Sequence, residues 1–441
     1  MAEAIIARRG GSGEVIVEFD NFIPSNIDSL KHSTPAALSV GRRELAGASV
    51  GNYALFAGGY DGSYRNTVNA YDTSLTRSTP TTLSAGRRSL AGASVGNYAL
   101  FAGGYDGSYL DAVDAYDTSL TRSTPTALSA GRERLAGASV GNYALFAGGI
   151  YGSSSYRNTV DAYDTSLTRS TPTVLSVGRS RLAGANVGNY ALLAGGYTGS
   201  NYNTVDAYNA SLTRSTPTAL STPRSSLAGA SVGNYALFAG GYDGSLRDTV
   251  DAYDTSLTRS TPTALSVGRD TLAGASVGDY ALFAGGSGSS PTYKDTVDAY
   301  NTSLTHSTPA TLSVARYSLA GASVGNYALF AGGYDGSLRD TVDAYDTSLT
   351  RSTPTALSVG RERLAGASVG NYALFAGGYT ASSLNTVDAY TPPVLEARLY
   401  MPIGTKYKFG ESEEIATTNE IIVRVPLTGY IKFKKGVIRN G

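Results

Sequence analysis

Few residues in this chain could carry out chemistry on their own. Its 441 residues include no Cys, no Trp and only two histidines, His32 and His306. Without Cys, thiolate and disulfide chemistry are excluded, and a Ser-His-Asp site would need one of the two histidines beside a serine. Carboxylates such as Asp61 and Asp106 recur at regular intervals instead of forming one singular pair. We therefore expect no enzymatic activity, no cofactor and no metal site.

The elements that position these residues form an internal repeat. Gly-Gly pairs recur in steps of 45 or 47 residues, at 58–59, 103–104, 148–149, 195–196, 240–241, 285–286, 332–333 and 377–378. A fixed period of this length is typical of a propeller, a solenoid or an array. Short apolar runs such as "LAGASV", "YALFAG" and "TVDAY" are separated by Gly, Asp, Ser and Pro, which favours strands. Four short strands per period predict one propeller blade.

One copy of the repeat carries a family resemblance. Gly58 and Gly59 follow an apolar strand, and Tyr71 and Arg87 follow at the spacing of the kelch motif. The chain thus resembles kelch-repeat β-propellers over residues 30–391. The resemblance implies strands at 45–50, 53–58, 67–71 and about 77–83 in the first blade. Unlike the family, the fourth strand carries Arg or His instead of Trp, and His32 and His306 are the two His copies.

Counting the repeats predicts an all-β, eight-bladed kelch-like β-propeller. The chain starts with a lone fourth strand at about 32–38 and ends with a trio at 364–390. Pairing of these segments would close the ring and remove open sheet edges. His32 and His306 would then lie in separate blades, too far apart to share a metal.

The two flanking segments do not repeat. Residues 1–29 contain a strand candidate at 14–24, and residues 392–441 contain two more, at 420–427 and 429–436. The first flank is acidic and the second is basic. We predict that the two flanks form a small β module that mounts the propeller of residues 30–391.

Differences between the copies are confined to one face of the predicted disc. The turns "VGNY" and "DTSLT" are nearly constant, whereas the segments after the Gly pairs and after the fourth strands vary. Both length changes, at 150–156 and 287–293, also fall there. The predicted ligand-binding residues on this face are Arg43, Arg88, Arg134, Arg181, Arg363, Tyr317, Tyr60, Tyr105, Tyr197, Tyr242, Tyr334 and Tyr379. Drift of unconstrained loops is the alternative explanation.

A second set of arginines is present in every copy, and we predict for it a structural role, paired with the repeated Asp of "VDAY". Its members are Arg42, Arg87, Arg132, Arg179, Arg224, Arg269, Arg316 and Arg361.

Charge and targeting features narrow the functional classes. With 35 basic and 35 acidic residues the net charge is zero, so the basic surplus of a nucleic-acid-binding protein is missing. We find no signal peptide and no membrane-spanning run.

The start "MAEAIIARRGG" with degenerate kelch-like copies is similar to proteins encoded among the tail genes of bacteriophages of Gram-positive bacteria. This resemblance implies a virion protein, assembled in the host cytoplasm. It would bind a host-surface glycan or protein, and other tail proteins through the terminal module. The alternatives are a cytoplasmic scaffold that binds a peptide, and structural decoration of a virion.

Overall fold

The chain folds into an eight-bladed, all-β propeller. The computed structural model describes residues 7–9, 15–17, 30–152, 154–290, 292–400, 406–409, 412–415 and 420–426. It divides the chain into two compact units, residues 32–391 and residues 1–31 with 392–441. The described residues form no helix, and so none long and apolar enough to span a membrane.

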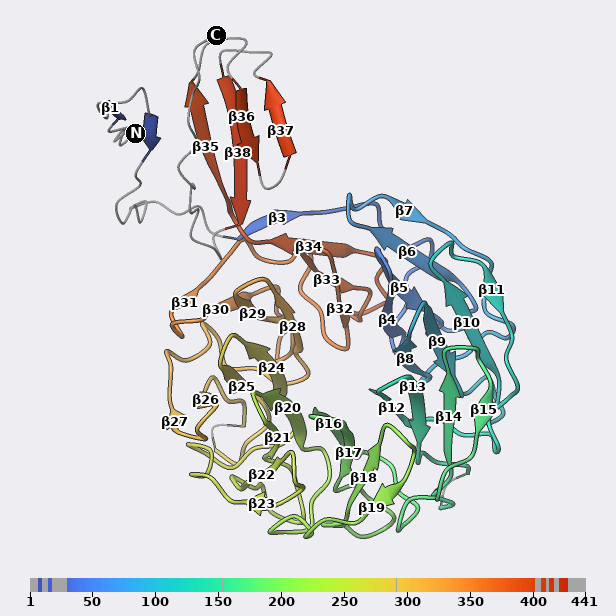
Figure 1. Ribbon diagram of the computed structural model, residues 1–441. Coiled ribbons are helices and arrows are strands. Elements are labelled where there is room, and N and C mark those ends of the chain that lie inside the picture. Colours follow the sequence, from blue (N-terminus) through green and yellow to red (C-terminus); the bar gives the residue numbers. More distant parts are fainter. Residues whose placement is uncertain are drawn as a thin grey trace. The chain divides into compact units, whose positions relative to one another are not determined.

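Each blade is an antiparallel sheet of four strands, which follow one another in chain order in blades 1 to 7 (Figure 1). Blade 1 consists of β4 (Ala46–Val50), β5 (Tyr53–Ala57), β6 (Val68–Asp72) and β7 (Arg77–Ser78), and blade 2 consists of β8 (Ala91–Val95), β9 (Tyr98–Ala102), β10 (Val113–Asp117) and β11 (Arg122–Ser123). Blade 3 consists of β12 (Ala136–Val140), β13 (Tyr143–Ala147), β14 (Val160–Asp164) and β15 (Arg169–Ser170). Blade 4 consists of β16 (Ala183–Val187), β17 (Tyr190–Ala194), β18 (Val205–Asn209) and β19 (Arg214–Ser215).

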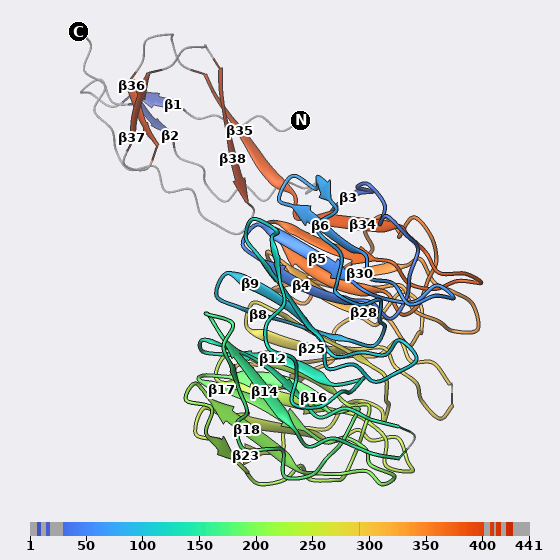
Figure 2. The same ribbon diagram turned by 90° about the vertical axis from the view of Figure 1, so that its right-hand side faces the viewer.

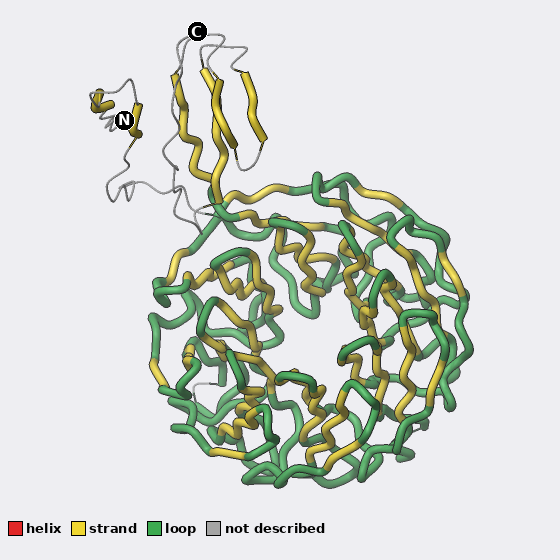
Figure 3. The backbone as a smooth tube through the Cα atoms, in the orientation of Figure 1, coloured by secondary structure: helices red, strands yellow, loops and turns green. Residues whose placement is uncertain are grey.

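Blades 5 to 7 continue this order with β20 (Ala228–Val232), β21 (Tyr235–Ala239), β22 (Val250–Asp254) and β23 (Arg259–Ser260); β24 (Ala273–Val277), β25 (Tyr280–Ala284), β26 (Val297–Asn301) and β27 (His306–Ser307); and β28 (Ala320–Val324), β29 (Tyr327–Ala331), β30 (Val342–Asp346) and β31 (Arg351–Ser352). The first strand of each blade lies nearest the centre of the ring (Figures 1 and 3).

Blade 8 closes the ring with strands from both ends of the repeat region. It consists of β32 (Ala365–Val369), β33 (Tyr372–Ala376), β34 (Val387–Thr391) and the N-terminal β3 (Lys31–Ser33), which pairs with β34. This confirms the predicted blade count and the predicted closure. The fourth strands are shorter than predicted, because β7 spans only Arg77–Ser78. Pro80 follows two residues later, and proline has no N–H to donate to a ladder.

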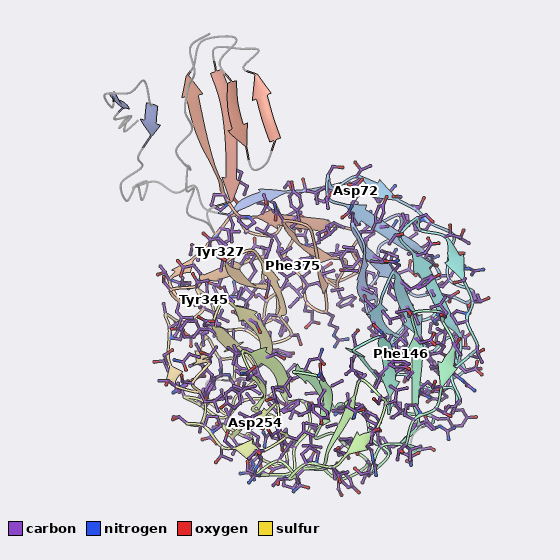
Figure 4. The ribbon with its side chains drawn as sticks, viewed as in Figure 1. Asp72, Phe146, Asp254, Tyr327, Tyr345 and Phe375 are labelled. Atoms are coloured by element: carbon purple, nitrogen blue, oxygen red, sulfur yellow. The ribbon has the colours of Figure 1, made fainter. Side chains whose placement is uncertain are left out.

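The core lies between neighbouring blades, whose sheets face one another (Figure 2). In one cluster Leu55 and Val68 of blade 1 pack with Phe101 and Tyr116 of blade 2. The middle strands are buried on both sides, which explains why "YALFA" is a continuous apolar run without alternation. Figure 4 shows Phe146 and Phe375 on two of these strands. Full burial of such a ring contributes about 1.5–3 kcal/mol.

The repeated arginines are structural, as predicted, and seven of the eight pair with the repeated Asp. In blade 2, Arg87 Nη2 donates to Asp114 Oδ2 at 2.7 Å, and neither side chain is exposed. The backbone N–H and hydroxyl of Ser84 donate to the same carboxylate. On the outer strand Arg122 approaches Asp114 at 3.4 Å. These hydrogen bonds occupy both oxygens of the Asp114 carboxylate, whereas Arg87 Nε is buried without a partner among the described residues.

The two histidines serve the same structural network in different blades. His32 contacts Asp388 in blade 8 and His306 contacts Asp298 in blade 6, each at 2.7 Å. In these two blades the histidine of the fourth strand therefore contacts the buried carboxylate, as Arg122 does in blade 2. The described residues contain no group of three potential metal ligands.

The eighth repeated arginine, Arg42, has no carboxylate partner. Its Nη2 donates to Asn69 Oδ1 at 2.9 Å and to the Phe56 carbonyl at 3.0 Å. Asn69 Nδ2 is buried without a partner. Burial lowers the pKa of Arg42 to about 10. Blade 1 thus holds a buried guanidinium that is hydrogen-bonded but not neutralised.

The constant face has a structural reason for its constancy. Asp72 Oδ1 accepts the N–H groups of Ser74 and Thr76, each at 2.9 Å, and Leu75 adopts a φ of +63°. The same turn recurs at Asp254 (Figure 4). A Cβ added at Gly51, where φ is +50°, would lie 2.9 Å from Thr118 of the next blade. The two turns pack against each other, so packing alone fixes their sequences.

A ring of hydrogen bonds joins the inner strands. The hydroxyl of Ser94 donates to the carbonyl of Ser49 in the preceding blade at 2.6 Å, and equivalent bonds cross seven of the eight interfaces. The bond between blades 3 and 4 is missing, because Asn186 replaces the serine. At the other interfaces a Cβ on the inner glycine would meet the preceding glycine carbonyl within 3.2 Å, whereas at Gly184 the nearest atom is 3.9 Å away. The inner edge is therefore open between blades 3 and 4.

The terminal unit contains three two-stranded antiparallel ribbons among its described residues. They pair β1 (Ala7–Arg9) with β2 (Val15–Val17), β35 (Val394–Tyr400) with β38 (Glu420–Pro426), and β36 (Lys406–Phe409) with β37 (Ser412–Ile415). The predicted strand at 420–427 corresponds to β38. Of the predicted strand at 14–24 only β2 is described, and the predicted strand at 429–436 lies outside the described residues.

Candidate ligand-binding face

The variable face presents its side chains from a constant backbone. The residue after each Gly pair forms a β-bridge with the residue after each structural arginine, in all eight copies. In the first copy, Arg43 N donates to Tyr60 O at 3.0 Å and Tyr60 N donates to Arg43 O at 2.9 Å. The residue after the bridge has a φ of +51° to +56° in all eight copies, although none of them is glycine. Such a conformation costs about 1–2 kcal/mol for an L-residue.

The five predicted arginines fall into two geometric classes. Arg43 and Arg88 occupy the bridged position and are half-buried, and their Cζ atoms each lie 5.4 Å from the centroid of the Tyr60 ring. Arg134, Arg181 and Arg363 occupy the left-handed position and are exposed. Within this second class, Arg181 lies over the Tyr197 ring, with its Cζ 5.8 Å from the ring centroid, which is within the range of a cation–π contact.

Tyrosines form a continuous arc over blades 1 to 3. Ring centroids are 5.3 Å apart for Tyr60 and Tyr64, 5.8 Å for Tyr64 and Tyr105, and 5.1 Å for Tyr105 and Tyr109. Tyr109 continues the arc to Tyr151 at 5.1 Å. Arg43 extends it into blade 8, since its Cζ lies 4.4 Å from the Tyr379 ring centroid.

The other predicted residues lie apart from this arc. Tyr317 and Tyr334 form a separate cluster with Tyr293, which stacks on Tyr317 at 5.7 Å. Tyr242 is 43% exposed and makes no ring contact with another described residue. Arg363 is 56% exposed and lies 3.7 Å from Glu362. The structure therefore divides the predicted residues into several groups.

One cavity on this face gathers three of the predicted residues. It has a volume of about 280 Å³ and is lined by Tyr109, Glu133, Arg134, Ile150, Gly152, Tyr156, Ser180, Arg181 and Tyr197. These residues come from blades 2, 3 and 4. The blade 3 segment includes the length change at 150–156, which positions Tyr156 at the cavity.

Glu133 is the most unusual member of the cavity. It is 6% exposed, and its Oε2 is buried without a hydrogen-bond partner. Its Oε1 lies 3.8 Å from Arg134 Nε. Burial raises the pKa of the Glu133 carboxyl, because the charged form loses hydration. A buried acceptor without a donor costs about 1–3 kcal/mol.

The charges on the variable face differ between sectors. The variable segments of blades 3 and 4 carry a net charge of +2, from Glu133, Arg134, Arg157 and Arg181. Those of blades 5 to 7 carry −3, from six acidic and three basic residues: Asp243, Arg247, Asp248, Asp270, Lys294, Asp295, Asp335, Arg339 and Asp340. The cavity therefore lies in the basic sector.

The aspartates in the "DGS" loops are satisfied within their own loops. Asp61 accepts from Arg65 Nε at 2.9 Å and from Arg65 Nη2 at 2.6 Å. Asp243 and Asp335 form the same i,i+4 ion pair. These three carboxylates already have cationic partners.

Residue-by-residue prediction missed Glu133, Tyr109, Tyr156 and Ser180. Tyr109 and Tyr156 do not directly follow a Gly pair, which was the position that set most of the predicted tyrosines apart. Glu133 follows a structural arginine as Glu362 does, so the sequence alone does not distinguish the two glutamates. The length change at 150–156 was the sequence signal that pointed to this blade.

Comparisons with known proteins add little. No protein-family model matches the chain, and no curated protein matches it. A solved structure titled "Structure of YjhT" is 14% identical and covers 62% of this chain and 99% of that chain, with a TM-score of 0.42. A similarity this weak carries no argument about function. The propeller assignment rests on the sheet topology of the chain itself.

Proposed function

We propose that the protein is a non-enzymatic binding protein that recognises a host-surface glycan or protein through its variable face. The cavity between blades 2, 3 and 4 is the observation that carries this proposal. It combines two exposed guanidiniums, Arg134 and Arg181, with tyrosine rings and an unpartnered carboxylate oxygen. Tyr and Arg are the residue types enriched at recognition surfaces.

The constant backbone of this face supports the same role. Eight bridged frames fix the two ends of each loop, and six of the eight loops also have the same length, so side chains can be exchanged without moving the frame. Binding and catalytic residues are commonly placed on loops held by a rigid scaffold. Packing between the turns of the opposite face accounts for the constancy of that face.

We further propose that the protein is a kelch-type tail protein of a bacteriophage. This assignment is supported by the Gly-Gly, Tyr and Arg landmarks of each repeat and by the first residues, "MAEAIIARRGG". In such a particle the terminal unit would attach the propeller to other tail proteins. Copurification of the protein with virions is the direct measurement.

The recognition role is tested by binding of the purified protein to intact Gram-positive cells and to a glycan array. We expect Arg134→Ala and Arg181→Ala to lower binding at least tenfold. Arg363→Ala is the matched control, because it removes an exposed arginine from the same repeat position outside the cavity. Equal losses for all three variants would remove the cavity from the recognition site. Retention of full binding by Arg134→Ala and Arg181→Ala would refute the proposal.

A further inference from the structure

The repeat itself contains a control for what is special about the cavity. Residues 131–135 and 360–364 have the same sequence, "GRERL", at equivalent positions in the ring. In both copies the arginine Nε lies beside the glutamate Oε1, at 3.8 Å for Arg134 and 3.7 Å for Arg363. Only in the first copy is the glutamate Oε2 buried without a partner. The difference arises from the neighbouring loops, since the local sequence is identical.

The unpartnered Oε2 of Glu133 defines one requirement for a ligand. A buried carboxylate oxygen accepts hydrogen bonds and, when ionised, donates none. Glu133 lines the cavity but its Oε2 is buried, so the Glu133 side chain has to turn toward the cavity before this oxygen can accept from a ligand O–H or N–H. Such a hydrogen bond relieves the cost of leaving the acceptor unsatisfied. Ligand hydroxyl groups meet this requirement.

The cationic side chains define a second requirement. Glu133 supplies one negative charge to the cavity wall, and Arg134 and Arg181 supply two positive charges. One guanidinium charge therefore remains uncompensated within the cavity. Guanidinium groups bind carboxylate and phosphate oxygens through charge-assisted, often bidentate hydrogen bonds. A ligand with one acidic group would neutralise this remaining positive charge.

The size and the aromatic lining limit the ligand further. A volume of 280 Å³ corresponds to roughly nine water molecules at ~30 Å³ each, which suits a single sugar ring. Tyr109, Tyr156 and Tyr197 line the cavity, and tyrosine presents an apolar ring face together with a polar hydroxyl. The apolar face suits the C–H side of a sugar ring.

We propose that this cavity binds one acidic sugar unit of a surface polysaccharide. Hydroxyl groups of the sugar donate to Glu133, and its carboxylate or phosphate faces Arg134 and Arg181. The inference rests on the proposed recognition function and narrows its ligand class.

The test uses the full chain and an array on which each acidic glycan is paired with a neutralised counterpart. A galacturonic acid oligomer is paired with its methyl ester, which keeps the hydroxyl groups and removes the charge. Glucose 6-phosphate paired with glucose distinguishes a phosphate from a carboxylate as the acidic group. Positive pairs are then measured by isothermal titration calorimetry at two salt concentrations.

We expect the acidic member of a pair to bind at least tenfold more tightly than its neutral counterpart, with affinity that falls as salt rises. Arg134→Ala and Arg181→Ala should abolish this preference, and Arg363→Ala should leave it unchanged. Equal binding of acid and methyl ester would overturn the inference, as would the same loss in Arg363→Ala.

Failure of the inference is distinguishable from failure of the recognition function. Binding to neutral glycans or to cells that depends on Arg134 and Arg181 would leave the recognition function standing and overturn only the acidic sugar. Binding that depends on neither arginine would overturn both.

Discussion

Restoring the missing buried carboxylate in blade 1 should stabilise the ring. In the substitution Asn69→Asp, the unpartnered Nδ2 becomes an oxygen that can accept from Ser39 Oγ, as the second carboxylate oxygen of Asp114 accepts from Ser84 Oγ in blade 2. At present Asn69 Oδ1 accepts from Arg42 and from both the N–H and the hydroxyl of Ser39. The change spreads these donors over two oxygens and neutralises the guanidinium.

The magnitude follows from the terms that the substitution changes. Relieving a buried unsatisfied donor is worth about 1–3 kcal/mol, and a charge-assisted hydrogen bond is worth roughly 1 kcal/mol more than a neutral one. The desolvation of a new carboxylate opposes both. We expect a net gain of about 2 kcal/mol. For a unit of 360 residues, an unfolding entropy of ~2.1 cal/mol/K per residue converts this gain to about 3 °C in Tm.

The assay is thermal and denaturant unfolding followed by circular dichroism. The reverse substitution Asp114→Asn gives blade 2 the arrangement of blade 1 and leaves Arg87 and Arg122 without a carboxylate. It should lower stability by about 3 kcal/mol, because breaking a buried pair leaves an uncompensated charge. A lower Tm for Asn69→Asp, or an unchanged Tm for Asp114→Asn, would refute this account of the arginine network.

Three further outcomes are expected. Eight buried tyrosines donate their hydroxyls to loop carbonyls, as Tyr71 does to Ala36 O, and burial raises the pKa of each above its usual value near 10. Above pH 10 the unfolded chain therefore binds fewer protons than the folded one, and the free energy of unfolding falls by about 1.4 kcal/mol per tyrosine per pH unit. Circular dichroism and tyrosinate absorbance should show unfolding within about one unit above pH 10. A fold that survives to pH 12 would contradict this expectation. Deletion of residues 30–39 removes the strand that closes blade 8 and should lower Tm sharply, and an unchanged Tm would disprove the closure. Glu133→Met should raise stability by about 1 kcal/mol and weaken ligand binding at least tenfold, whereas the matched Glu362→Met should change neither.

The fold was predictable because its determinants are repeated. Each blade places the same apolar residues on its middle strands. The first "STP" segment precedes the first Gly pair, which indicated that the N-terminal strand closes the ring. The buried ion pairs were predictable for the same reason, since Arg87 and its seven equivalents each recur with an acceptor 27 or 29 residues further along the chain.

The candidate site was only partly predictable, because it depends on which loops meet. Tyr109, Glu133 and Arg181 come from three different blades, and no local sequence signal joins them. The identical segments 131–135 and 360–364 show this limit directly: the same five residues leave Glu133 Oε2 buried and unpartnered and do not do so for Glu362. The loops next to the segment, and not its own residues, therefore determine whether the glutamate Oε2 is buried without a partner.

The serine bonds of the inner strands have a consequence for how the ring could change in size. Seven of the eight blades donate from this serine to the preceding blade, so the same donor and acceptor meet at seven interfaces. Such a head-to-tail interface does not by itself fix the number of blades. A duplicated or deleted blade leaves neighbours that form the same contacts. The interface between blades 3 and 4 is the exception, since it lacks the serine bond and the atom nearest to a Cβ on Gly184 lies 3.9 Å away. Tyr156 and Arg181 of these same two blades line the cavity, so gain or loss of a blade at this interface would change the residues that a ligand meets as well as the size of the ring.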